Sequence, residues 1–344
     1  MKKELGTYED LLEIVKNTID DQDIVFAISK LFLIEDDLKL PEGLKNIFIR
    51  NEKLGVFVGA GVSKLLGLPL WRELANKSIE YLYESNKINY FEYQRIINDV
   101  NDPKQKLTIF HKILPKSTLD AKEFYEKTFE NKTKKPNESG CVYDLLVKFD
   151  WIKLSSNIDN EFDNALSRKN KSIFNEIVDD KAVLTKKKSR NVINFKVENL
   201  DYGKIYPIHG SLVDGLESCV LTTEDYLKTY YENLEFREFI GKIFKEYTIL
   251  FIGYGLEEFP ILEYIIKNSR KHYTLVPTYL NEMNLFRLHK EYFEVLNIEP
   301  IPYYLDFKGY ERLNDVLSAW ENEIKDLRGK DYYQRIREMD DIID

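Results

Sequence analysis

Six short apolar runs, separated by segments of helical periodicity, most constrain what this chain can fold into. Runs of this length that do not alternate with polar residues are typical of strands buried on both faces. Because helical segments connect them, they favour parallel strands joined by crossover helices. We therefore predict an α/β fold, a Rossmann-like doubly wound parallel sheet of about six strands. The expected strands cover residues 54–59, 151–156, 204–210, 247–255, 272–277 and 298–305.

Helical periodicity also defines the parts of the chain outside this sheet. Apolar residues recur at helical spacing from about residue 8, between the first two strands, and again in the charged tail from Tyr310. The predicted parts are an N-terminal helical extension over residues 1–50, a sheet domain over 51–306 with a helical insertion at about 72–150, and a C-terminal helical segment over 307–344.

Charge and cysteine content exclude several classes of protein. The formal net charge of -9 argues against general nucleic-acid binding, which needs clustered Lys and Arg to neutralise phosphates. Two local basic runs, at residues 132–135 and 186–190, lie in polar stretches and are predicted to be solvated loops. Cys141 and Cys219 are too few for a four-cysteine zinc site or a disulfide framework.

Membrane and export signals are not found in the sequence. No apolar run approaches the roughly 20 residues that a bilayer-spanning helix needs. The first residues are acidic and lack the apolar core of a signal peptide. We expect a cytoplasmic protein that makes no membrane contact.

A glycine turn follows the first strand. Three small residues, Gly59, Ala60 and Gly61, precede Ser63 at the edge of the sheet where ligands of such folds bind. A backbone with so little side chain admits either a phosphate or another stretch of backbone at close range. The pattern GxGxxG lacks its last glycine here, so the turn by itself leaves both possibilities open.

Polar groups and glycines follow three further strands. In "SSNID", Asn157 and Asp159 lie on the same side of an extended chain, although an Asx turn would explain them equally well. His209 ends the next strand, where an imidazole that titrates near neutrality would reach the ligand crevice. The strand in "LFIGYGLEE" closes on Gly253 and Gly255, which a tight turn alone would also explain.

Together these stretches resemble the motifs of sirtuins in their order and spacing. "GAGVSKLLGLPLWR" resembles the sirtuin GAG turn that precedes a Ser and a Gly-Ile-Pro-Asp-Phe-Arg element, "SSNID" resembles Gln-Asn-Ile-Asp, and "IHGSL" resembles the His-Gly element. "TTEDYLKTY" and "FIGYGLEE" are similar to later motifs of the bacterial sirtuin-like domains of antiviral defence proteins. The resemblance covers about residues 54–305.

This resemblance implies that NAD is the substrate and assigns roles to the motif residues. Asn157 and Asp159 would hold the nicotinamide end and a water beside the anomeric carbon, and His209 would be the acid/base group. The glycine turn would admit the pyrophosphate to a helix N-terminus. The implied NAD-binding residues are Gly59, Ala60, Gly61, Ser63, Arg72, Gly253 and Gly255.

Two departures from the sirtuin pattern bear on the expected reaction. Leu70 stands where the Pro-Asp-Phe-Arg element has Asp, so the loop over nicotinamide is expected to be set differently. The paired CxxC motifs of the deacylase zinc module are missing, so we expect no zinc and no framed cleft for an acylated peptide. Water is then the expected nucleophile, and the expected activity is that of an NAD glycohydrolase.

Two other functions remain open at this point. A protein deacylase or ADP-ribosyltransferase would use the same site on a protein acceptor, and a non-enzymatic sensor would bind NAD or ADP-ribose without turnover. The family analogy further implies an effector of an antiphage abortive-infection system. Such an effector would be a homo-oligomer or would work with a sensor or ATPase partner that controls it.

Overall fold

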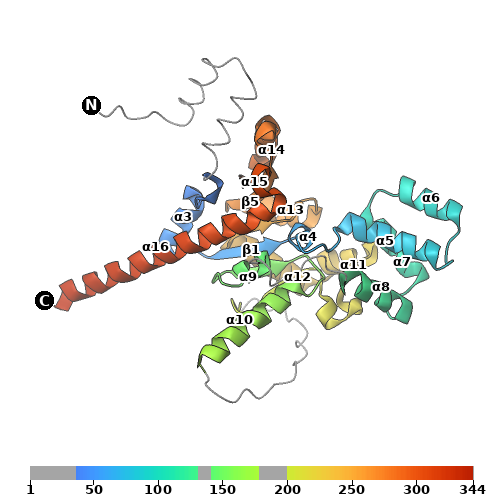
Figure 1. The fold of residues 1–344 in the computed structure, drawn as a ribbon, viewed down its shortest axis with the longest axis horizontal. Helices are drawn as coiled ribbons and strands as arrows, with labels where there is room; N and C mark the ends of the chain where they lie inside the picture. Colours follow the sequence, from blue (N-terminus) through green and yellow to red (C-terminus); the bar gives the residue numbers. More distant parts are fainter. Residues whose placement is uncertain (1–35, 131–140, 178–199, 344) are drawn as a thin grey trace. The chain divides into compact units, whose positions relative to one another are not determined.

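The computed structural model describes residues 36–130, 141–177 and 200–343 (Figure 1). The helices expected before residue 36 and the two basic runs lie outside the described residues. No helix within these ranges is long and apolar enough to cross a membrane.

A six-stranded sheet forms the centre of the fold, with the strand order β3-β2-β1-β4-β5-β6. The strands pair in parallel, and helices separate them along the chain, so the predicted Rossmann-like α/β fold is confirmed. The third strand is shorter than expected because its chain turns after Pro207. The strands are β1 (Leu54–Val58), β2 (Ile152–Ser155), β3 (Ile205–Pro207), β4 (Thr248–Ile252), β5 (His272–Thr278) and β6 (Ile298–Tyr304).

The strand order reverses direction between β1 and β4, which pair from Leu54↔Thr248 to Val58↔Ile252. In open parallel sheets a crevice forms beyond the carboxyl ends of the strands at such a switch point, and ligands bind there. The turns after Val58 and after Ile252 both lie at this point. Topology alone therefore marks where a ligand site is to be sought.

One face of the sheet packs against two helices, α12 (Leu234–Glu246) and α13 (Phe259–Ile266). Alternate residues of the strands point to this face, among them Phe57 and Phe251, whose rings lie 5.5 Å apart. Five apolar side chains of α12 recur at helical spacing and are buried here, namely Phe236, Phe239, Ile240, Ile243 and Phe244. This packing fixes the carboxyl ends of the strands in a rigid base.

The chain between β1 and β2 forms the helical insertion, which has its own apolar core. Side chains cap the N-termini of two of these helices. Asn89 accepts a hydrogen bond from the backbone N–H of Glu92, and Asp102 accepts one from the backbone N–H of Lys104. The helices are α4 (Ala60–Lys64), α5 (Trp71–Glu84), α6 (Tyr90–Asp99), α7 (Pro103–Ile113), α8 (Leu119–Glu130) and α9 (Val142–Leu146).

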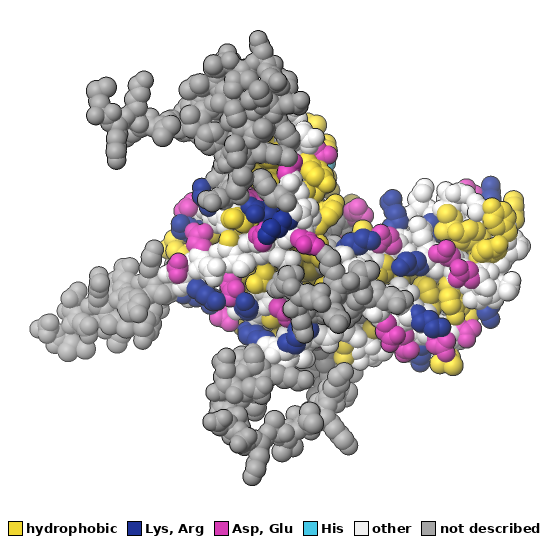
Figure 2. Space-filling model, in the orientation of Figure 1, with side chains coloured by type: hydrophobic (Ala, Val, Ile, Leu, Met, Phe, Trp, Pro, Cys, Tyr) yellow, Lys and Arg dark blue, Asp and Glu magenta, His cyan; other side chains and the backbone are white. Residues whose placement is uncertain are grey.

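The surface of the helical insertion mixes charges and carries exposed aromatic residues. On the face shown in Figure 2, Lys and Arg side chains are interspersed with Asp and Glu. Tyr90 and Phe91 of α6 are 62% and 72% exposed, which is unusual for aromatic side chains. This part of the surface is therefore available for contact with another molecule.

Between β2 and β4 the chain forms mainly short helices that carry functional side chains toward the sheet ends. One of them, η5, is a π-helical turn, a geometry often found at functional sites. These elements are α10 (Glu161–Ile177), η3 (Leu212–Asp214), η4 (Leu216–Ser218), α11 (Thr223–Leu227) and η5 (Lys228–Glu232).

The chain divides into two compact units, and the site described below lies entirely in the unit formed by residues 51–275 and 293–300. Within the other unit, a buried ion pair joins Arg312 to Asp37, with Nη2 and Oδ1 2.6 Å apart. The Trp320 indole N–H donates to the carbonyl of Lys39. The remaining elements are η1 (Asp36–Leu38), α3 (Glu42–Ile49), η6 (Leu280–Glu282), α14 (Met283–Val295), α15 (Leu305–Lys308), η7 (Gly309–Glu311) and α16 (Arg312–Ile343).

Candidate functional site

The glycine turn after β1 packs directly on the turn after β4. The backbone N–H of Gly61 donates to the carbonyl of Gly253, 2.9 Å away. A Cβ on Gly59 would lie 2.5 Å from that same carbonyl oxygen, and one on Gly253 would lie 2.6 Å from the Val62 nitrogen. Gly253 also has φ +61, which disfavours other residues. The sequence left open whether the glycine turn admits a phosphate or another stretch of backbone. The structure shows that it admits the backbone of the turn after β4.

Four polar side chains gather beside this turn in what we call the Asn157 cluster: Ser63, Tyr143, Asn157 and Asp159. All four are buried. The Asn157 amide nitrogen lies 3.0 Å from the Gly59 carbonyl oxygen, 3.0 Å from Ser63 Oγ and 2.8 Å from the Tyr143 hydroxyl. The side chain that follows β2 is thus tied to the turn that follows β1.

The hydrogens of the Asn157 cluster can be assigned from its donors and acceptors. Ser63 Oγ donates its single hydrogen to Asp159 Oδ2, 2.6 Å away. The Tyr143 hydroxyl, 2.6 Å from Ser63 Oγ, must then donate to it. Asn157 in turn donates to the Tyr143 oxygen. The result is a chain of donors from Asn157 through Tyr143 and Ser63 that ends on a carboxylate, in which each bond polarises the next.

Asp159 also begins the helix α10, because its Oδ1 accepts a hydrogen bond from the backbone N–H of Glu161. Burial, followed by the charge of Asp159, raises the pKa of Tyr143 well above its ordinary value. Tyr143 therefore stays protonated and remains a donor. The Asn157 side-chain oxygen is buried and accepts no hydrogen bond within the described ranges. This oxygen is therefore able to accept a hydrogen bond from a ligand.

A second group, the His209 cluster, consists of His209, Tyr230 and Glu258. His209 Nε2 lies 2.9 Å from the Tyr230 hydroxyl and 3.3 Å from Glu258 Oε2. The indole of Trp71 meets the imidazole edge to face, with ring centroids 5.6 Å apart. His209 Nδ1 is buried and has no hydrogen-bond partner among the described residues.

Glu258 is ionised in the His209 cluster. Burial by itself would raise its pKa, but the charge of a protonated His209 and the nearby hydroxyls of Tyr226 and Tyr254 outweigh burial and lower it to about 2. Glu258 follows Leu256, which adopts φ +52 although it has a side chain, and which is buried in the core. The turn after β4 therefore contains a strained backbone conformation, at Leu256, two residues before the Glu258 carboxylate.

The segments that carry the two clusters run side by side beyond the sheet. The backbone N–H of Ile208 donates to the carbonyl of Ser155, at 2.7 Å, and that of Leu212 donates to Ile158, at 2.8 Å. Parallel pairing of β2 with β3 therefore continues past the last strand residues. Because Asn157 and His209 lie between these two hydrogen bonds, they emerge from neighbouring segments at the same edge of the sheet.

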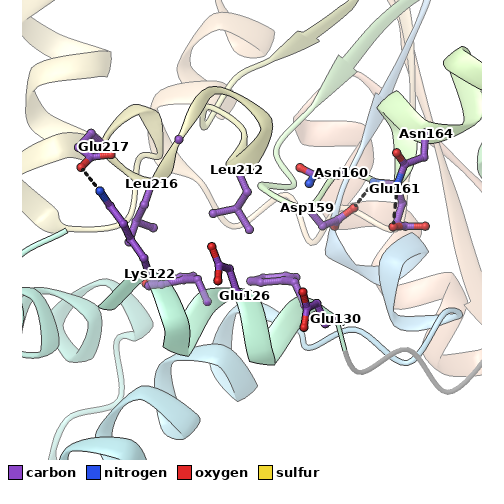
Figure 3. Close-up of a pocket in the computed structure, with 13 residues that line it drawn as sticks. Lys122, Glu126, Glu130, Asp159, Asn160, Glu161, Asn164, Leu212, Leu216 and Glu217 are labelled. Carbon is purple, nitrogen blue, oxygen red and sulfur yellow. Dashed lines mark hydrogen bonds and ion pairs between the residues drawn. The ribbon is translucent and has the colours of Figure 1, made fainter. Parts of the chain in front are cut away.

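A pocket of about 630 Å³ opens beside the Asn157 cluster, between α8 and the start of α10 (Figure 3). Asp159 is the residue shared by the pocket and the cluster. Lys122 is paired with Glu217, with Nζ and Oε1 3.2 Å apart. The carboxylates on the wall of the pocket disfavour the binding of a phosphate there and favour a neutral or cationic group. The carboxylates that line the pocket are those of Glu126, Glu130, Asp159, Glu161 and Glu217.

Not every residue implied by the sirtuin resemblance joins these clusters. Arg72 is exposed on α5, and in the described part of the chain no hydrogen bond or ion pair links it to either cluster. Gly255 is exposed, and a Cβ there would meet nothing closer than the Glu257 side chain at 3.5 Å. Ala60 opens the short helix α4 within the glycine turn. The structure brings together Gly59, Gly61, Ser63, Asn157, Asp159 and Gly253.

Sequence reasoning missed three members of the clusters: Tyr143, Tyr230 and Glu258. Tyr143 comes from the helical insertion, 80 residues after its partner Ser63, and no local pattern marks it. Glu258 had a usable signal, because it is an acidic residue that follows the glycine turn at a strand end. Within the described ranges, no group of three or more His, Cys, Asp or Glu side chains is placed to hold a metal ion.

Comparisons with known proteins agree with this architecture. Residues 153–301 match the family model described as a SIR2-like domain. The chain is also 31% identical over 245 residues to "Defense-associated sirtuin 2" of Bacillus subtilis. The matched region covers 68% of this chain and 21% of that protein, so this chain spans about a fifth of the relative's length.

Proposed function

Because the chain carries a sirtuin-like domain, we propose that it binds NAD and hydrolyses the bond between nicotinamide and ribose. The observation that carries the proposal is a pair of buried acceptor atoms at the same edge of the sheet. Asn157 Oδ1 and His209 Nδ1 each lack a hydrogen-bond partner within the described residues. Buried polar atoms are normally paired, so two unpaired ones at the end of a parallel sheet indicate a ligand.

The proposed reaction converts NAD and water into nicotinamide, ADP-ribose and a proton. As the nicotinamide–ribose bond breaks, its electron pair goes to the nicotinamide nitrogen and the ribose carbon becomes oxocarbenium-like. His209 accepts the proton that water gives up as its oxygen bonds to that carbon. The Asn157 cluster holds the nicotinamide amide and the water in place, and its rigidity lowers the entropy cost of the step.

Two features favour water as the nucleophile. The chain has two cysteines, Cys141 and Cys219, and both are buried as free thiols, so a paired CxxC zinc module cannot frame a peptide cleft. The pocket beside Asp159 is walled by carboxylates, and its volume of about 630 Å³ suits a small group rather than a folded partner. A protein deacylase or ADP-ribosyltransferase is the alternative, and a non-enzymatic NAD or ADP-ribose sensor is a third.

The biological setting that we propose is antiphage defence by abortive infection, in which NAD loss stops the infected cell. The name of the relative supports the defence role, since it is a "Defense-associated sirtuin 2". Continuous NAD hydrolysis would harm the host, so the activity must be controlled by oligomerisation or by a sensor or ATPase partner. The exposed aromatic residues Tyr90 and Phe91 on the helical insertion support such a contact.

Chromatography of NAD incubated with the purified chain tests the proposal. We expect nicotinamide and ADP-ribose in equal amounts without any added protein acceptor, in larger yield once an activating partner is present. NAD consumption that requires an acylated peptide would instead establish the deacylase alternative. Binding of NAD by calorimetry, with no product under any condition tested, would establish the sensor.

A further inference from the structure

The carboxylate of Glu258 has no part in the chemistry described so far, yet it lies against the proposed base. Its Oε2 is 3.3 Å from His209 Nε2 and 3.3 Å from the Tyr230 hydroxyl. The Glu258 side chain is 14% exposed and that of His209 is 3% exposed. A charge this poorly solvated is costly unless it is paired, so this contact is a strong one.

The charge state of Glu258 decides which imidazole nitrogen carries hydrogen. A pKa of about 2 makes Glu258 an acceptor of hydrogen bonds at physiological pH. Burial raises the pKa of Tyr230 well above its ordinary value, so its hydroxyl stays protonated and donates to Glu258 Oε2. The nitrogen that faces these two groups is Nε2, and a carboxylate is satisfied there by an N–H.

We propose that Glu258 is a positioning residue that holds His209 as the Nε2–H tautomer, which makes Nδ1 the atom that accepts the proton. This inference rests on the proposed NAD hydrolysis and identifies the ring nitrogen that accepts the proton in that reaction. Nδ1 is the ring nitrogen without a hydrogen-bond partner among the described residues, so its lone pair is available. The proton of the attacking water moves to Nδ1, and Glu258 stabilises the imidazolium that forms.

The Tyr230 hydroxyl also lies 2.9 Å from His209 Nε2, but it donates its hydrogen to Glu258 and so presents an acceptor oxygen to the ring, which an Nε2–H satisfies as well. Trp71 and Tyr226 meet the ring through their aromatic faces and edges, with centroids 5.6 Å and 5.8 Å from it. Lys104 is the cation nearest to this group of rings, and its ammonium lies over Tyr226, 4.1 Å from the centroid. The Tyr254 hydroxyl makes no hydrogen bond to His209 within the described residues. Glu258 is thus the anion that sets the orientation.

Nitrogen NMR of protein labelled with ¹⁵N-histidine tests this assignment without any need for activity. The chain has four histidines, and two of them provide internal references. The backbone N–H of Ile249 donates to Nδ1 of His272, which fixes the Nε2–H tautomer there. Nδ1 of His111 lies 3.1 Å from the Leu114 carbonyl, which fixes the Nδ1–H tautomer.

We expect His209, identified by the signal lost in His209→Ala, to match His272 and not His111 when its ring is neutral. Glu258→Gln should mix the two tautomers, because an amide can either donate or accept. Glu257→Gln, on the exposed neighbouring carboxylate, is the matched control and should leave the spectrum unchanged. A His209 spectrum of the Nδ1–H type in the wild-type protein would overturn the proposal.

Kinetics provides the second test. Glu258→Gln should lower kcat roughly 10²-fold and move the acidic limb of the pH–rate profile to lower pH, because the imidazolium loses its stabilising charge. Glu258→Asp should restore part of the rate, and Glu257→Gln should have no effect. An unchanged pH profile in Glu258→Gln would contradict the role. If the wild-type protein showed the expected tautomer but no NAD cleavage, the proposed function would fail while the geometry stood.

Discussion

The Asn157 amide nitrogen lies 3.0 Å from the carbonyl oxygen of Gly59, which precedes it by 98 residues. One side chain therefore fixes the glycine turn at the switch point and presents its own oxygen to the proposed ligand. We therefore expect substitutions at either residue to affect both the proposed binding of NAD and its hydrolysis.

Asn157→Ala and His209→Ala should each lower NAD turnover by roughly 10²- to 10⁴-fold, the usual range for loss of an acid–base or positioning group. His209→Ala removes the proton acceptor but touches neither glycine turn, so its NAD affinity should stay close to that of wild type. Asn157→Ala also removes the contact to Gly59 and should weaken NAD binding in addition. Chromatographic turnover and calorimetric titration separate the two effects. Wild-type turnover in either folded variant would show that the catalytic residues are wrongly named.

Gly59→Ala should destabilise the protein by about 1–3 kcal/mol, since the new Cβ would lie 2.5 Å from a backbone oxygen of Gly253 that cannot move aside. Gly255→Ala is the matched control in the neighbouring turn, where a Cβ meets only the flexible Glu257 side chain at 3.5 Å. Urea unfolding of both variants makes the comparison. Equal stability of the two would mean that the glycine turns are not packed as described.

Lys153 should make stability depend on pH in the alkaline range. This lysine is buried on β2, where its ammonium donates to the carbonyls of Phe149, Trp151 and Tyr202. Burial lowers its pKa from 10.5 to about 8. Between these values the unfolded chain binds more protons than the folded one, so stability rises with pH through this window, and at pH 7 the full cost of the buried charge is present.

Lys153→Met removes that titration. From pH 8 to pH 9.5 the wild-type protein should gain about 1 kcal/mol of unfolding free energy relative to the variant. Urea unfolding at each pH measures the difference. Parallel stability curves for the two proteins across this range would contradict the depressed pKa.

Asp37→Ala should cost about 3–5 kcal/mol, because it removes the 2.6 Å ion pair of the buried Arg312 guanidinium. A guanidinium keeps its proton at any ordinary pH even without Asp37, so the arginine cannot escape this cost by becoming neutral. Lys308→Ala is the control, because it breaks an exposed ion pair with Asp315 and should cost less than about 1 kcal/mol. Similar losses in the two variants would refute the buried character of the Asp37 pair.

The sheet could be predicted because its signals are local. Each strand is a short apolar run, and the order of runs and helices along the chain specifies parallel pairing. The third strand is shorter than its apolar run because the chain turns after Pro207 and carries the buried His209 away from the strand, a feature that hydrophobicity does not encode. The sequence therefore predicted which segments form strands, but it predicted the ends of the strands less accurately.

The candidate site was only partly predictable. Ser63, Asn157, Asp159 and His209 stand beside glycines or strand ends, and the structure places them in two buried clusters. Tyr143 comes from a short helix that no local pattern marks, and Tyr230 ends the stretch "TTEDYLKTY", whose resemblance to a motif did not single out this residue. Their roles depend on tertiary contacts, since each hydroxyl finds its partner only after distant elements pack.

The helical insertion starts and ends on the two clusters. At its beginning, Trp71 rests on the imidazole of His209, and near its end, Tyr143 is hydrogen-bonded to Ser63 and Asn157. Because Trp71 is the first residue of α5, a displacement of α5 would move an aromatic ring that lies against the proposed base. Since α6 packs on α5, a partner bound at the exposed Phe91 would act on that ring through α5, at a distance from the proposed site.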